Sequence, residues 1–289
     1  GHTLGGGRHW VDAYRVMLER IKAEAAARGV ALTTENTAEP YMDTIDAYLA
    51  WNPRRDNDVP LLPAVYSGYT LYFTSPQSPA DDLDAYALAQ GRDLLWGCQL
   101  GWNSEWLLEP AHAEKLALTL ELSRLRLAAR DFMVFGELLD EIRPLEPLPV
   151  QTVTWNRRQP HSASLPVVQG TLWRSRSGEL GVFLMNSSDR PQAIRYAVRP
   201  GDWLEAASSA WLVERLTPAG RAPWQESAGP AVEREDILAA REIRGLVLRA
   251  AAPEAAARAR ALADGPDAVL AGCARDYLFT TALRQAGLT

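Results

Sequence analysis

The sequence predicts a chain of two architectures, an α/β part followed by an all-β part. In residues 1–145, apolar runs alternate with helical patterns, which is typical of parallel strands covered by helices. Residues 146–250 carry short strand patterns separated by turn signals, which favour an antiparallel β-sandwich. A proline-rich connector over residues 143–149 separates the two compositions. We therefore expect the C-terminal half of a (β/α)8 barrel, then an antiparallel β-sandwich, then a helical tail over residues 251–289.

The α/β part begins with an amphipathic helix. Apolar side chains recur at helical spacing over residues 9–28, and Gly29 stands where helices commonly end. The elements expected after it are a buried strand to Glu35, a helical turn at Glu39 and Pro40, strands over 46–51 and 59–66, a helix over 81–90, a strand over 94–100, a helix over 110–130 and a shorter helix over 132–141. Four strands alternating with helices make half of a barrel, and we assign them as strands five to eight.

The second part is expected to form short strands joined by turns. These strands are predicted over residues 165–173, 180–185, 192–198, 210–216 and 243–249. A hairpin turn is expected at residues 177–179, where Gly178 lies between two polar residues. The tail is rich in alanine and arginine and has helical propensity.

Composition excludes several classes of function. The 289 residues carry a net charge of -6 and no cluster of lysine and arginine, which argues against a nucleic-acid partner. No apolar run approaches the ~20 residues that span a membrane. The two cysteines lie far apart, and no metal-ligand spacing occurs, so we expect no metal and no cofactor. The 10 Trp and 9 Tyr fit a carbohydrate protein, in which aromatic planes stack on sugar rings, but a large core uses the same residues and is the favoured explanation.

Glu35 is the first candidate for chemistry. It ends an apolar strand, and α/β proteins place ligands at the carboxyl ends of parallel strands. Glycoside hydrolysis needs two carboxyl groups, and Glu39 is the nearest second candidate. Both have plain structural alternatives, since Glu35 could pair with an arginine under a loop and Glu39 could favour a helix N-terminus. Asp46 starts a strand, at the end of a barrel that serves stability, and we interpret it as structural.

Five further residues are expected to line the same edge as substrate-binding groups. They stand at predicted strand ends or on the glycine-rich first loop, and they are His2, Trp51, Tyr66, Gln99 and Trp102. Gln99 is predicted to be a buried amide, which must find hydrogen-bond partners. A carboxylate, an imidazole, an amide and several rings are the residue types of a glycosidase cleft. The aromatic residues fit packing as well as they fit a site, and His2 fits solvent exposure equally well.

Several stretches resemble a known family. They are HTLGGGRHW, TTENTAEPYMDTIDAYLAW, VPLLPAVYSGY, LLWGCQLGW and GTLWRSRSGELGVFLMNSS. The chain resembles the C-terminal part of a bacterial glycoside-hydrolase-like family, in which a (β/α)8 barrel with distant α-galactosidase-type similarity precedes a β-sandwich. The resemblance covers residues 1–250. It implies that Glu35 is the acid/base or a substrate ligand, and that the nucleophile is an aspartate upstream of Gly1. The chain is accordingly expected to be a fragment that needs the missing half of the barrel, or another chain, for activity.

The function expected from these residues is hydrolysis of O-glycosidic bonds in an oligosaccharide or glycoside. The alternative is a non-catalytic carbohydrate-binding protein with an aromatic cleft. A second carboxylate within roughly 5–10 Å of Glu35 would favour hydrolysis. A barrel lyase or aldolase is disfavoured, because no lysine stands at a predicted strand end to form a Schiff base.

Overall fold

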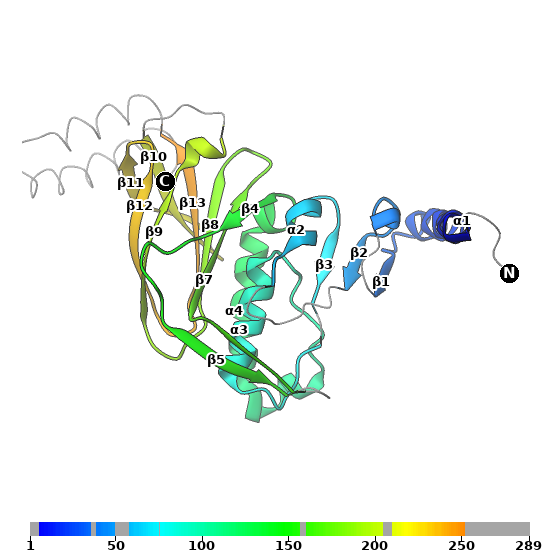
Figure 1. The fold of residues 1–289 in the computed structure, drawn as a ribbon, viewed down its shortest axis with the longest axis horizontal. Coiled ribbons are helices and arrows are strands. Elements are labelled where there is room, and N and C mark those ends of the chain that lie inside the picture. The colour runs from blue at the N-terminus through cyan, green and yellow to red at the C-terminus, as the bar shows by residue number, and fades with distance from the viewer. Residues whose placement is uncertain are drawn as a thin grey trace, which may run out of the picture.

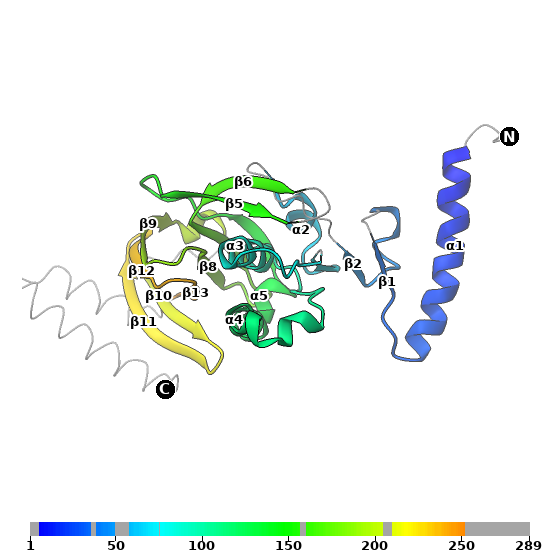
Figure 2. The same ribbon diagram turned by 90° about the horizontal axis from the view of Figure 1, so that it is seen from below.

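The computed structural model describes residues 6–35, 39–49, 58–74, 76–156, 160–204 and 210–251. Its elements form layers, which Figure 1 shows from one side and Figure 2 from below. A small parallel sheet is followed by helices α3 and α4, then by a six-stranded antiparallel sheet, then by a two-stranded sheet on the far side. The chain therefore combines parallel α/β packing with many antiparallel strands, as the sequence predicts in outline.

The parallel sheet has its strands in chain order. It contains β1 (Thr33–Glu35), β2 (Ala47–Leu49) and β3 (Leu71–Phe73), in the order β1-β2-β3. A parallel bridge between Phe73 and Gln99 adds a fourth segment beside β3. Consecutive strand segments thus lie side by side. The described strands do not close a barrel, and the half-barrel assignment stays a prediction.

The first helix, α1 (Gly6–Ala27), confirms the predicted amphipathic helix, and the turn η1 (Glu39–Tyr41) follows β1 as expected. The helix lies to one side of the other elements (Figure 2). Its side chains reach η1 and the following turn, where Tyr14 contacts Tyr41 edge-on at 5.0 Å and Arg15 pairs with Asp43 at 2.8 Å. Much of its apolar face is exposed to solvent, including Trp10.

The strand predicted over residues 59–66 is wrong, because Leu61–Tyr66 forms helix α2. Pro60 and Pro63 explain the difference. A proline has no N–H to donate to a strand ladder but fits the first turn of a helix. The Pro60 carbonyl accepts the Ala64 amide at 2.9 Å, which is a helical bond. The third strand is β3, which the sequence reading missed.

The strand predicted over residues 94–100 is also largely wrong. Helix α3 (Leu83–Leu95) begins at the expected place, where Asp82 accepts the Ala85 amide at 2.7 Å, but it continues through Gly91. A Cβ at Gly91 would lie 2.6 Å from Met185 Cγ of the six-stranded sheet. Gly91 therefore allows close packing of helix on sheet rather than ending the helix, and Gln99 alone of the predicted strand pairs with β3.

After two 3-10 turns, η2 (Glu105–Leu108) and η3 (Pro110–His112), helix α4 (Ala113–Ala128) confirms the predicted long helix. The helix expected over 132–141 is wrong beyond its start, because α5 (Arg130–Met133) ends early and β4 (Glu137–Glu141) follows. Gly136 permits this change of direction. A Cβ there would lie 2.4 Å from the Arg174 carbonyl and 2.5 Å from that of Phe132, so no larger residue fits.

The antiparallel part confirms the predicted sheet type. The six-stranded sheet has the order β11-β10-β13-β8-β7-β4, and β12 pairs with β9 in a separate sheet. The strands are β5 (Val150–Trp155), β6 (His161–Pro166), β7 (Val168–Arg174), β8 (Leu180–Asn186), β9 (Gln192–Val198), β10 (Ala210–Thr217), β11 (Gly220–Ala228), β12 (Val232–Leu238) and β13 (Ile243–Ala250), with a turn η4 (Pro200–Asp202) after β9. The sequence prediction missed β5, β11, β12 and all but the end of β6. It predicted β9 at its observed bounds.

Two cores hold the layers together. One lies between the helices and the six-stranded sheet, where Trp173, Phe183 and Met185 are buried against α3 and α5. The other lies between the six-stranded sheet and the β9–β12 pair, around Trp211 and Tyr196. Strand β4 precedes the proline-rich connector in the chain and pairs with β7, which follows it. The six-stranded sheet therefore includes residues from both sides of the connector. The division into residues 1–145 and 146–250 stays a prediction, and the tail beyond residue 251 lies outside the described residues.

Candidate functional site at the carboxyl edge of the parallel sheet

Four residues form one row across the carboxyl edge of the parallel sheet. Glu35 is paired with Leu49, Leu49 with Phe73, and Phe73 with Gln99. Residues paired across strands point to the same face, because side chains alternate along each strand with a period of two. Tyr48 and Tyr72, one position earlier, lie in the core against the helices. The row therefore points to the face away from those helices, with Glu35 at one end and Gln99 at the other.

The spacing of the row limits what it can do. Adjacent strands lie about 4.8 Å apart, so three spacings place the backbones of Glu35 and Gln99 roughly 14 Å from each other. Two groups at that separation do not act on one bond. They fit contacts to two different parts of an extended ligand.

Glu35 is exposed at the end of an edge strand. Its strand pairs with β2 on one side, and Thr33 is exposed as well. The sequence predicted a buried strand at this place, and that prediction is wrong for the described structure. An edge strand leaves one side of its backbone unpaired, so its residues lack the cover that a central strand has. The carboxylate is therefore open to solvent and to ligands.

Gln99 also differs from its predicted environment. Its side chain is exposed rather than buried, while both its backbone N–H and its backbone carbonyl bond to the chain at the end of β3. The Gln99 amide donates to the Tyr72 carbonyl at 2.6 Å, and its carbonyl accepts the Thr74 amide at 3.2 Å. The side-chain amide is thus carried on a hydrogen-bonded backbone and is exposed to solvent and to ligands.

Trp102 stands three residues after Gln99 with an unusual backbone. Its φ is 50°, in the left-handed region that a bulky side chain rarely adopts. Its carbonyl accepts the Gln77 amide at 3.2 Å, which joins the two loops that follow β3 and Gln99. The ring is exposed and lies 6.4 Å from that of Phe73. Backbone strain of this kind persists where the surroundings enforce it, and it is concentrated at ligand sites.

Lys115 holds the loop beside Trp102 in place, and the sequence analysis did not predict this role. The side chain is buried, and Nζ donates to the carbonyls of Pro79 and Asp81 at 2.9 and 2.6 Å. The same ammonium lies 5.6 Å from the Tyr86 ring and 5.5 Å from that of Trp106. Burial lowers the pKa of Lys115, and the nearby Asp81 opposes this shift. The available signal was its helical spacing from Leu118 and Leu122, which places it on the apolar face of α4.

Asp46 is structural, as the sequence predicts. It lies at the amino edge of β2, where its carboxylate accepts the Leu32 amide at 2.7 Å and pairs with Lys22. Burial would raise the pKa of Asp46, but the hydrogen bonds from Lys22 and from the Leu32 amide lower it below its ordinary value. The carboxylate joins the end of α1 to the parallel sheet.

The structure separates Tyr66 from the other predicted site residues. Tyr66 ends helix α2 and is half-buried, and it lines a cavity with Asp46 and Tyr69. Because Asp46 marks the amino edge of the sheet, the expected position of Tyr66 at a carboxyl strand end is wrong.

Three predicted site residues cannot be placed. His2 and Trp51 lie outside the described residues, and Glu39 lies in η1 without a described side chain.

Within the described ranges, no cluster of three or more potential metal ligands occurs. None of the described helices is both long and apolar enough to cross a membrane.

Comparison with known proteins gives relatives of one kind. Residues 1–76 match the family described as "Domain of unknown function (DUF6259)". A protein of Bacteroides thetaiotaomicron named "Putative glycoside hydrolase" is 32% identical over 199 residues, which cover 67% of this chain and 29% of the relative. "Putative glycoside hydrolase 22789" of Monosiga brevicollis is 36% identical over 118 residues, which cover 36% of this chain and 9% of the relative. The resemblance to a glycoside-hydrolase-like family is confirmed. This chain spans less than a third of either relative's length.

Solved structures give a weaker likeness. An α-galactosidase of Saccharomyces cerevisiae with raffinose aligns at a TM-score of 0.45 and 8% identity, covering 83% of this chain and 69% of that one. A GH30 endoxylanase of Clostridium papyrosolvens aligns at a TM-score of 0.42 and 11% identity, covering 81% and 60%.

Proposed function

We propose that this chain is part of a glycoside hydrolase-like protein that contacts its sugar at the carboxyl edge of the parallel sheet. The observation that carries the proposal is the row that places Glu35 and Gln99 on one face of that edge. A carboxylate, an amide and the exposed ring of Trp102 supply a proton-transfer group, a hydroxyl partner and a stacking surface. The names of the relatives support the same class.

We further propose that β1, β2, β3 and the Gln99 segment are strands five to eight of a (β/α)8 barrel. Adjacent positions for consecutive parallel strands support this assignment. A sheet of this kind has two unpaired edges, which are unfavourable unless other strands cover them. The remaining strands would come from another part of the whole protein or from another chain.

In this proposal Glu35 serves as the acid/base or as a direct sugar ligand. Hydrolysis requires a second carboxyl group, about 5–5.5 Å away in retaining enzymes and about 6.5–9.5 Å away in inverting ones. Leu49, Phe73 and Gln99 occupy the rest of the row and cannot fill that role. The second carboxylate would be Glu39 or a residue outside this sequence. Gln99, roughly 14 Å from Glu35, would bind a different sugar unit of the same substrate.

The test is Glu35→Gln in the intact protein, assayed on a panel of aryl glycosides and oligosaccharides. This exchange keeps the size of the side chain and removes its acidic proton. We expect kcat/KM to fall at least about 100-fold, as is usual for loss of a general acid or base. Glu114→Gln, at an exposed position of α4, is the matched control and should leave the rate unchanged. An unchanged rate in Glu35→Gln would exclude Glu35 from the chemistry.

A second function is favoured by one observation. The row at the carboxyl edge carries one carboxylate, which suffices for binding a sugar but not for hydrolysing its glycosidic bond. A non-catalytic carbohydrate-binding protein would bind oligosaccharides without turnover. Calorimetric titration of the intact protein beside the rate assay separates the two functions, because Trp102→Ala would weaken binding in both while turnover exists only in the enzyme.

A further inference from the structure

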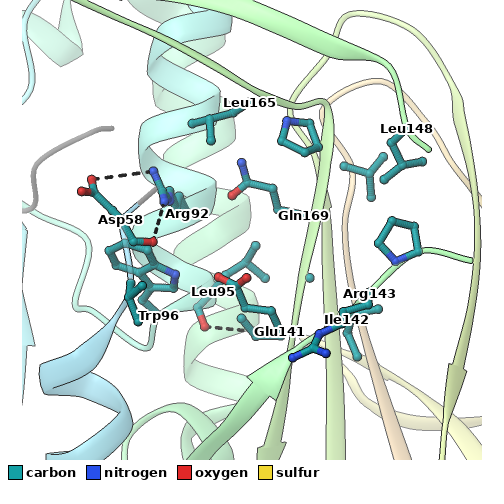
Figure 3. A pocket seen from close by; sticks show the side chains of 16 residues that line it. Asp58, Arg92, Leu95, Trp96, Glu141, Ile142, Arg143, Leu148, Leu165 and Gln169 are labelled. Atoms are coloured by element: carbon teal, nitrogen blue, oxygen red, sulfur yellow. Dashed lines mark hydrogen bonds and ion pairs between the residues drawn. The ribbon is translucent and has the colours of Figure 1, made fainter. Parts of the chain in front are cut away.

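A second cavity lies away from the parallel sheet's carboxyl edge. It occupies about 400 Å³ between the last turn of α3, the connector after β4 and the start of β7 (Figure 3). More of its wall is apolar than polar, and its apolar lining includes Leu95, Ile142, Leu148, Leu165 and Val168. The loop that follows β3 at the carboxyl edge leads into the first turn of α3, whereas this cavity lies beside the last turn of α3. A helix rises 1.5 Å per residue, so the 13 residues of α3 separate the two places by about 18 Å.

The connector forms the cavity because it is attached near β7 at both ends and to β9 between them, where the Leu145 amide donates to the Arg195 carbonyl at 2.8 Å. The Ile142 amide donates to the Gly170 carbonyl at 2.8 Å, and the Val167 amide donates to the Pro149 carbonyl at 2.9 Å. Pro144 and Pro166, which also line the cavity, have no N–H with which to close the gap. The space is therefore a consequence of the backbone path and does not depend on one side-chain rotamer.

Gln169 supplies an unused donor to this space. It lies on β7 and points toward α3 in Figure 3. Its Nε2 is buried and has no hydrogen-bond partner among the described residues. Buried amide groups are nearly always paired, since an unpaired one gives up its bonds to water without replacement. A ligand with an acceptor oxygen at this point would restore the bond.

The charges around the cavity balance. Asp58 and Glu141 are acidic, and Arg92 and Arg143 are basic. Arg92 is held in place, stacked 4.6 Å from the Trp96 ring and donating to the Asp58 carbonyl at 3.2 Å. Balanced charge disfavours a strongly charged ligand, while the mixture of donors and acceptors fits hydroxyl groups, which act as both.

We propose that this cavity binds a neutral sugar unit of monosaccharide size, with a ring oxygen or hydroxyl accepting from Gln169 Nε2 and an apolar face against Leu148 and Leu165. The site would hold carbohydrate at a distance from the carboxyl edge and would perform no chemistry. The class of ligand rests on the proposed function, while the site itself rests on the cavity.

The test is calorimetric titration of the intact protein with D-galactose, D-glucose, D-xylose and D-glucuronate. Trp102→Ala, which should weaken sugar binding at the carboxyl edge, serves as the background. We expect at least one neutral sugar to bind in that background and glucuronate to bind more weakly. Adding Gln169→Met should weaken this binding at least tenfold, because it removes the donor at nearly constant volume. Leu148→Trp, which fills the space from its half-buried rim, should have the same effect.

Stability gives an independent readout. Gln169→Met removes an unpaired buried donor, so the midpoint of unfolding without sugar should stay the same or rise while affinity falls. Gln192→Met, the same exchange on β9 outside the cavity, should leave sugar affinity unchanged. Equal sugar affinity in Gln169→Met and the parent, or no binding by any of the neutral sugars, would overturn the proposal. Binding that depends on Gln169 in a protein without glycosidase turnover would support this site and refute the catalytic function.

Discussion

The indole Nε1–H of Trp155 donates a hydrogen bond to the Ala85 carbonyl at 2.9 Å. Trp155 ends β5, and Ala85 lies in the first turn of α3, 70 residues earlier in the chain. Around this bond Val153, Ala163 and Leu165 of the β5–β6 hairpin bury Leu88 and Ala89 of the helix. The hairpin thereby holds the N-terminal end of α3, which follows the loop after β3.

Trp155→Phe should therefore destabilise the protein. The exchange keeps an aromatic ring but removes a buried hydrogen bond and part of the buried volume, at a cost of about 2 kcal/mol in the free energy of unfolding. Urea denaturation followed by circular dichroism measures this change. Val150→Ala, at the exposed start of the same strand, should change stability by less than about 0.5 kcal/mol. Equal effects of the two exchanges would mean that the hairpin does not stabilise α3 through Trp155.

Asp236 should be the charged side chain whose replacement lowers the free energy of unfolding most. It is buried and accepts hydrogen bonds from Arg234 at 2.7 and 2.9 Å, from the Tyr196 hydroxyl at 2.8 Å and from Arg244 at 3.3 Å. Asp236→Asn removes a carboxylate charge from beside the buried guanidinium groups of Arg234 and Arg244, of which Arg244 keeps its pairing with Glu242 at 2.7 Å, and the loss costs about 3–5 kcal/mol. Glu235→Gln, its exposed neighbour on β12, is the control and should be nearly neutral.

The same group predicts acid sensitivity. Burial would raise the pKa of Asp236, but hydrogen bonds and charge from Arg234, with Tyr196 and Arg244, lower it below the ordinary value. A carboxyl group with a lowered folded pKa stabilises the fold above the pKa of the unfolded chain, about 3.9, and loses this contribution as pH falls toward the folded pKa. Unfolding free energy should therefore decline below about pH 4. A smaller decline in Asp236→Asn would confirm the assignment, and an identical decline would contradict it.

Gly91→Ala should destabilise the protein although alanine favours helices. The new Cβ would lie 2.6 Å from Met185 Cγ, closer than real side chains approach. Overpacking costs about 1–3 kcal/mol, against about 1 kcal/mol gained in helix propensity. Thermal unfolding should show a net loss, and Met185→Ala should be less costly in the Gly91→Ala background than alone. Gly7→Ala, on α1 with open space around it, should not destabilise.

Trp102→Gly separates binding from stability. Glycine relieves the left-handed backbone at φ 50°, a gain of about 1–2 kcal/mol that offsets the packing lost from a ring that is 44% exposed. We expect the unfolding free energy to change by less than about 1 kcal/mol while oligosaccharide affinity falls. Trp102→Phe should keep most of the affinity. A large loss of stability with unchanged affinity would identify Trp102 as a packing residue.

Local patterns predicted several features correctly. The start of α3 near residue 81 and the helical spacing in α1 and α4 depend on residues within one or two turns, so they are readable from the sequence. The structural role of Asp46 followed from its place at the start of a strand. Patterns failed where one residue has two uses, as at Gly91, which packs against a distant methionine instead of ending a helix.

What the sequence determined by itself was the presence of Glu35 and Gln99 near strand ends and the antiparallel character of the second part. Only the tertiary structure decided that the two residues share one row and one face, that Tyr66 lies at the opposite edge, and that Gln169 faces a cavity. The physical reason is the distance along the chain over which each effect acts. Propensity, capping and periodicity act over a few residues, whereas strand register and cavity walls arise from pairings between segments tens of residues apart, for which many arrangements satisfy the same local pattern.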